Sequence, residues 1–124
     1  MKASVLIACC LLAAALVMAG PLRPAWSHAE IVKSSPADGA SLTAIPAEIR
    51  AWFSEQLAGN SVIRLYDASN AVLAVGGIDL KDYTHTVMRL VPPLLKPGTY
   101  EVRWTAVAAD DYGVTHESFK FTVQ

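Results

Sequence analysis

The chain has 124 residues, which fits one domain of ordinary size behind a short leader. Its 10 basic and 11 acidic residues leave a net charge of −1, and no basic run occurs. Nucleic acid and anionic lipid surfaces are therefore not expected partners. Both cysteines, Cys9 and Cys10, fall in an apolar N-terminal segment, so the rest of the chain has neither a disulfide nor a thiolate metal ligand.

The N-terminal segment has the pattern of a secretory signal peptide. Lys2 precedes an apolar run over residues 3–19, and Ala25 and Ser27 provide small residues at the −3 and −1 positions of a cleavage site. We therefore expect a cleaved signal peptide over residues 1–27 and a mature exported domain over residues 28–124. Three alternatives stay open: an uncleaved anchor, because the run has about the minimum length for a membrane span, an earlier cut after Ala19, and lipidation at Cys9, because residues 6–9 resemble a lipoprotein cleavage box.

A cut after Ser27 makes His28 the first residue of the mature protein. Its free amino group and its imidazole Nδ1 are then two neutral nitrogen donors on one residue, a pair that suits a tetragonal Cu(II) site. The earlier cut would leave His28 inside the chain and disable this chelate. Without Lys2 and Arg23, 8 basic residues remain against 11 acidic ones, so the mature domain has a net charge of −3.

The mature region predicts an all-β fold. β-Branched and aromatic runs alternate with turn residues at short intervals, a pattern typical of a β-sandwich. Seven strands are predicted, over residues 28–33, 48–54, 61–67, 71–75, 84–91, 99–107 and 116–123. Apolar alternation within these runs predicts a core that includes Ile31, Phe53, Leu65, Val102, Trp104, Phe119 and Phe121.

The strand directions predict where the polar residues gather. If each strand reverses the one before it, the start of the first strand meets three loops at one end of the sandwich. These are the second–third, fourth–fifth and sixth–seventh loops. This end collects the three histidines and several acidic residues: His28, Glu55, His85, Asp110, Asp111 and His116.

Several motifs in order resemble the CopC family of periplasmic copper-binding proteins. They are His28-Ala29-Glu30, Ser35-Pro36-Ala37-Asp38-Gly39, Phe53-Ser54-Glu55, Lys96-Pro97-Gly98-Thr99-Tyr100, Trp104-Thr105-Ala106-Val107 and Phe119-Lys120-Phe121-Thr122-Val123. The resemblance implies a Greek-key β-sandwich or barrel, cupredoxin-like or immunoglobulin-like, with a Cu(II) site made by the N-terminal histidine. It also implies a role in copper tolerance or uptake, with a CopD-type membrane copper protein as partner.

The family's loop motif Asp-x-His is altered in this sequence. Aligned from the sixth strand, Asp110 is the aspartate and Tyr112 replaces the histidine; aligned from the seventh, Asp111 is the aspartate and Gly113 replaces it. The family's methionine-rich Cu(I) segment is also absent, since Met88 is the only methionine after the leader.

The resemblance and the residues together suggest a ligand set. His28 matches the family's N-terminal ligand, and Asp111 or Asp110 would add a carboxylate. His116 is the candidate for the missing imidazole: alternation with Phe119 points it outward, but a bend at the strand start would turn it inward. Three further residues are assigned supporting or possible roles: Glu55, His85 and Tyr112.

The leading hypothesis is a monomeric, non-enzymatic Cu(II) carrier or buffer of the periplasm. Two other classes remain open. One is a metal-free immunoglobulin-like interaction module, which the missing loop histidine favours. The other is a small copper oxidase with a histidine brace. No second histidine of such a brace is established, and the chain is too short to provide a substrate platform.

Overall fold

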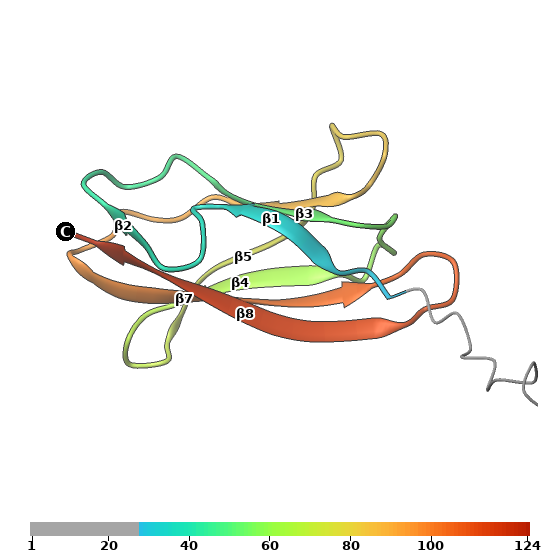
Figure 1. Ribbon diagram of the computed structural model, residues 1–124. Coiled ribbons are helices and arrows are strands. Elements are labelled where there is room, and N and C mark those ends of the chain that lie inside the picture. Colours follow the sequence, from blue (N-terminus) through green and yellow to red (C-terminus); the bar gives the residue numbers. More distant parts are fainter. Residues whose placement is uncertain (1–27) are drawn as a thin grey trace, which may run out of the picture.

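The computed structural model describes residues 28–124, which form strands and loops only (Figure 1). In this part of the chain no helix qualifies as a membrane span. The predicted signal peptide and its possible cleavage and lipidation sites lie outside the described residues.

Eight strands make up the domain, and they confirm the all-β prediction. Their bounds are β1 Ile31–Ser35, β2 Ala40–Leu42, β3 Ile49–Phe53, β4 Val62–Tyr66, β5 Val72–Ile78, β6 Val87–Leu90, β7 Gly98–Val107 and β8 Val114–Val123. The seven predicted strands are all present, and β2 is additional. β2 was missed because it has three residues, too few for an alternating pattern, and is held by parallel pairing with the end of β8.

The strands form one curled sheet in the order β1-β3-β6-β5-β4-β7-β8-β2. Non-consecutive neighbours such as β3–β6 and β4–β7 confirm a Greek-key arrangement rather than a simple meander. β5 joins the two halves, because its first part pairs with β4 and its last two residues pair with β6. Gly76 stands where β5 changes from one partner strand to the other. A side chain is excluded there, because a Cβ would lie 2.0 Å from the carbonyl oxygen of Arg89.

The core lies between the two halves of the curled sheet. Six of the predicted core residues are buried, from Phe53 on β3 to Phe121 on β8, whereas Ile31 on the edge strand β1 is only partly buried. Phe53 and Phe119 pack on Trp104 with ring centroids 6.0 and 5.9 Å away. These aromatic contacts add to the burial of apolar area, so the core supports the sheet without a disulfide.

Backbone hydrogen bonds join the β3–β4, β5–β6 and β7–β8 loops at one end of the sandwich. The Leu57 amide donates to the His85 carbonyl at 2.9 Å, and the Ala109 amide donates to the Gln56 carbonyl at 2.9 Å. The Ser54 amide donates to the Glu30 carbonyl at 2.8 Å, which brings in the start of the described chain. The predicted meeting of these segments is confirmed, and Figure 1 shows them opposite the C-terminus.

Candidate metal centre

The segment His28–Glu30 is anchored to the end of the sandwich. The side chain of Ala29 is fully buried, and its carbonyl accepts a hydrogen bond from Thr115 Oγ1 at 2.8 Å. The Glu30 amide donates to Ser54 Oγ at 3.0 Å. These contacts fix the backbone next to His28, while the His28 side chain itself is exposed.

The His28 imidazole lies directly against Gly113. A Cβ at residue 113 would fall 2.5 Å from His28 Nδ1, 2.9 Å from His28 Cε1 and 3.0 Å from Asp111 Oδ1. That same Asp111 oxygen accepts the Gly113 amide at 2.8 Å. An imidazole nitrogen and a carboxylate oxygen thus flank one glycine. Of the two loop aspartates, Asp111 is the one that shares this contact with His28.

Glu55 and Asp110 form the acidic side of this end. They line a pocket of about 380 Å³ together with Gln56 and Ala109. Asp110 Oδ1 accepts the Asp111 amide at 2.7 Å, which orders the start of the loop. Burial raises the pKa of Glu55, and the negative charges of Asp110 and Asp111 raise it further, while His28 opposes them. Glu55 is therefore close enough to His28 for their charges to interact.

His116 does not join this group. The pairing of β7 with β8 is regular throughout, with His116 opposite Thr105, and its Nδ1 lies 3.0 Å from Thr105 Oγ1. Thr115, the residue before it, reaches the Ala29 carbonyl, so His116 lies on the other face of β8. The suggested inward bend is therefore absent, and the outward orientation expected from alternation is the one observed.

The other two residues with possible roles lie in the loops at this end of the sandwich. His85 has a left-handed φ of 52°, and its charge helps to lower the pKa of Asp82. Tyr112 has a φ of 58°, and its side chain is 71% exposed. Thr115 was not anticipated as an anchor for the N-terminal segment. Its inward position follows from alternation with Phe119, but its partner is distant in sequence.

Side chains alone do not complete a metal site in the described range. Between residues 28 and 124, no group of three or more His, Cys, Asp or Glu side chains is arranged to hold a metal ion. The chemistry of the nearest pair, one imidazole and one carboxylate, suits Cu(II) better than Cu(I), which prefers sulfur. A main-chain donor such as the His28 nitrogen is what this pair would need.

Sequence comparison matches residues 31–124 to the CopC domain. The chain belongs to the CopC domain family. This CopC-domain chain is 32% identical over 103 residues to protein YobA of Escherichia coli strain K12, covering 80% of the chain and 81% of YobA. It is 28% identical over 95 residues to the copper transport protein CutJ of Bacillus subtilis strain 168. That match covers 75% of the chain, but the chain spans only 18% of the length of CutJ.

Solved structures give the same result for the fold. CopC from Methylosinus trichosporium OB3b superposes with a TM-score of 0.72 at 21% identity, covering 78% of this chain and 94% of that one. PcoC from Escherichia coli, described as a methionine-rich copper resistance protein, gives 0.66 at 27% identity, covering 79% and 100%. The predicted family is confirmed, and its copper-resistance and copper-transport members support a copper-related function.

Proposed function

We propose that this CopC-domain chain is a periplasmic Cu(II) carrier or buffer, with copper as its cargo. Residues 1–27 would be a signal peptide cut after Ser27, leaving residues 28–124 as the mature domain. The observation that carries the proposal is the His28 imidazole held against Gly113 beside the Asp111 carboxylate. A free amino group on the same histidine would convert this pair into a three-donor set.

The proposed donors are the His28 amine, the His28 imidazole Nδ1 and an Asp111 oxygen, with water or Asp110 at a further position. Two neutral nitrogens and a carboxylate match the tetragonal preference of Cu(II). Both nitrogens must be unprotonated to bind, so affinity should fall as the pH is lowered. No thioether site is proposed, because Met88 is fully buried in the core.

His116 is left out of the proposed donor set because it faces the opposite side of β8 and pairs with Thr105. Glu55 is assigned an indirect role: its half-buried carboxyl would add negative charge behind the cation without binding it. A carrier of this kind needs a place for its cargo and no group for catalysis, so a non-enzymatic role is proposed.

The proposed partner is a CopD-type membrane copper protein that exchanges copper with the carrier. In CutJ the matched region is a small part of a much longer copper transport protein. That arrangement supports a working link between a domain of this type and copper transport. We propose a monomer because the described core is completed within one chain.

The decisive experiment is to add one alanine before His28 in the mature protein. The extended protein keeps every side chain but moves the free amine off the histidine, so it should fold normally and lose most of its Cu(II) affinity. Isothermal titration and electron paramagnetic resonance measure the affinity and the nitrogen donors, and mass spectrometry of the exported protein verifies the first residue.

Equal Cu(II) affinity in the native and extended proteins would refute the amine chelate. Failure of the correctly cut protein to bind Cu(II) at all would refute the carrier function. That second result would favour the metal-free interaction module, which keeps the fold without the metal centre.

A further inference from the structure

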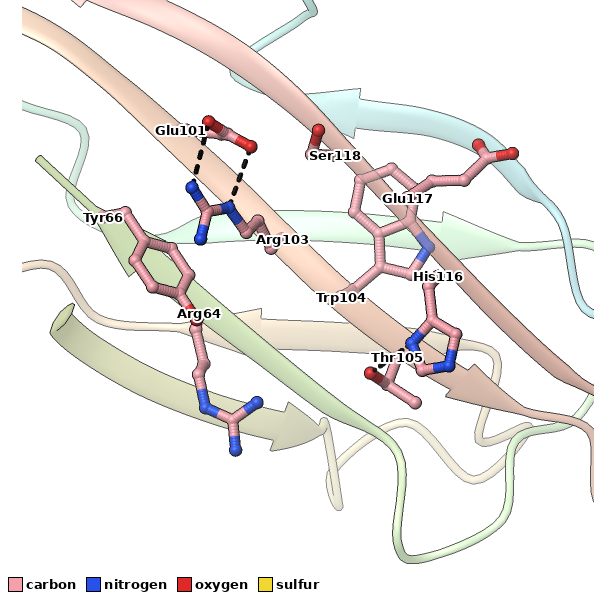
Figure 2. Close-up of a pocket in the computed structure, with 9 residues that line it drawn as sticks. All are labelled: Arg64, Tyr66, Glu101, Arg103, Trp104, Thr105, His116, Glu117 and Ser118. Carbon is pink, nitrogen blue, oxygen red and sulfur yellow. Dashed lines mark hydrogen bonds and ion pairs between the residues drawn. The ribbon is translucent and has the colours of Figure 1, made fainter. Parts of the chain in front are cut away.

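A second polar pocket lies on the outer face of the sheet, away from the candidate metal centre. It has a volume of about 330 Å³ and is formed by neighbouring residues of β4, β7 and β8 (Figure 2). Arg64 comes from β4, Arg103 and Thr105 from β7, and His116 from β8. None of these four belongs to the proposed copper donor set.

The two arginines of this pocket are directly opposite each other across the β4–β7 ladder. Neighbouring strands are about 4.8 Å apart, and like charges in that position are destabilising unless they are compensated. Arg103 is compensated: its Nε lies 2.9 Å from Glu101 Oε1, and its guanidinium carbon lies 4.0 Å from the centroid of the Tyr66 ring. Its Nη2 also donates to Asn70.

Arg64 has no such compensation. Its side chain forms no hydrogen bond or ion pair with any residue from 28 to 124, although it is half-buried. In Figure 2 the third nitrogen of Arg103, Nη1, also carries no dashed line, and the Glu117 carboxylate is directed away from both arginines. The pocket thus contains one arginine, Arg64, whose guanidinium donors the described chain leaves unused.

The same sheet contains a matched pair of arginines that is fully neutralised. Arg50 and Arg89 are directly opposite across the β3–β6 ladder. Glu48 bridges both of them, and Arg50 also lies 3.0 Å from Asp79. The Arg50–Arg89 pair is therefore neutralised by carboxylates of the chain, whereas in the Arg64–Arg103 pair only Arg103 is neutralised.

We propose that the outer pocket binds a phosphate-type oxyanion through Arg64 and Nη1 of Arg103. Such an anion supplies the missing counter-charge, and guanidinium groups bind phosphate oxygens with strong, charge-assisted hydrogen bonds. Thr105 and His116, already joined at 3.0 Å, form the polar wall on the other side. Because the domain carries a net charge of −3, a small free anion is the expected source rather than a lipid headgroup.

The test is a titration of the purified metal-free protein with inorganic phosphate, followed by amide chemical shifts in nuclear magnetic resonance at constant ionic strength. Saturable shifts are expected at Arg64, Arg103, Thr105 and His116. Arg64→Gln should weaken binding by about tenfold, which corresponds to about 1.4 kcal/mol. Lys96→Gln makes the same change of charge in the turn before β7 and should leave binding unchanged.

A parallel arm uses vesicles of phosphatidylglycerol and of phosphatidylcholine to distinguish the two sources of phosphate. Cosedimentation with phosphatidylglycerol alone, abolished by Arg64→Gln, would assign the site to a lipid headgroup. Response to inorganic phosphate without cosedimentation would assign it to a free anion. No response to either probe, or equal responses in Arg64→Gln and the native protein, would overturn the proposal. These experiments omit copper, so their outcome is independent of the carrier function.

Discussion

Gly113→Ala offers a sharp test of the geometry of the candidate metal centre. Glycine at residue 113 leaves the space that the His28 ring occupies, and an alanine Cβ would stand 2.5 Å from Nδ1 of that ring. The obstacle is an exposed side chain at the edge of the fold, which can move away. The substitution should therefore alter the position of His28 with little effect on the stability of the domain.

The expected size of the effect follows from the contact distances. Non-bonded atoms pack at roughly 3.5 Å or more, so the imidazole must shift by about 1 Å. Metal sites tolerate deviations of only about 0.2 Å in their ligand distances. Loss of groups that orient a metal ligand typically lowers affinity by about 10–100-fold, so Gly113→Ala should lose about 1.4–2.7 kcal/mol of Cu(II) binding.

Competitive Cu(II) titration would measure this loss, and thermal unfolding of the metal-free protein would measure stability. Gly59→Ala is the matched control, because Gly59 lies in the β3–β4 loop at the same end and a Cβ there meets nothing within 4 Å. We expect the control to bind copper as the native protein does. If Gly113→Ala also binds with native affinity, the imidazole does not hold copper at the observed position.

Three further predictions concern the core, the outer histidine and an ion pair. Phe121→Ala removes a ring that is 1% exposed and stacked 5.7 Å from Tyr100, so chemical denaturation should show a loss of about 3–5 kcal/mol; a loss below about 1 kcal/mol would contradict its place in the core. His116→Ala should leave the number of nitrogen donors unchanged in the electron paramagnetic resonance spectrum of the Cu(II) protein, because His116 faces away from His28; loss of one nitrogen would restore it as a ligand. The hydrogen bond from Arg50 holds the pKa of Glu48 below its ordinary value. A carboxyl whose pKa is lower in the folded state stabilises the protein at pH values above its unfolded-state pKa. This contribution disappears as the pH falls through its folded-state pKa. Glu48→Gln should therefore lower Tm at neutral pH, and the difference from the native protein should shrink as the pH is lowered through the folded pKa of Glu48. A difference that does not change with pH would exclude the ion pair as its cause.

Alternation and turn residues were sufficient to predict the core and the seven longer strands. Phe119 and Phe121 alternate with polar residues along β8, and burial of both follows from the two-residue period of a strand. The same period placed His116 on the outer face, where it lies. β2 escaped prediction because parallel pairing with β8, a contact between distant segments, holds it in place.

Within the candidate metal centre, the sequence indicated which residue types gather at one end but not which of them touch. Counting strand reversals brought the loop of Asp110 and Asp111 to the start of the domain. The choice of Asp111 beside His28 depended on how that loop closes around Gly113. The loop closes through its own hydrogen bonds, from the Tyr112 amide to the Ala108 carbonyl and from the Ala108 amide to the Gly113 carbonyl. The contact with His28 also needs the bond from Thr115 to the Ala29 carbonyl, which joins segments far apart in sequence.

The sequence by itself determined the class of fold and the inward face of each long strand, and it predicts a signal-peptide cut before His28. These features are local, because they depend on the side-chain period of a strand and on residues adjacent in the chain. The tertiary structure alone decided that His28 packs on Gly113 and that Arg64 stands opposite Arg103. Both depend on the register between segments far apart in sequence, and a shift of one residue in that register would carry every side chain of a strand to the other face.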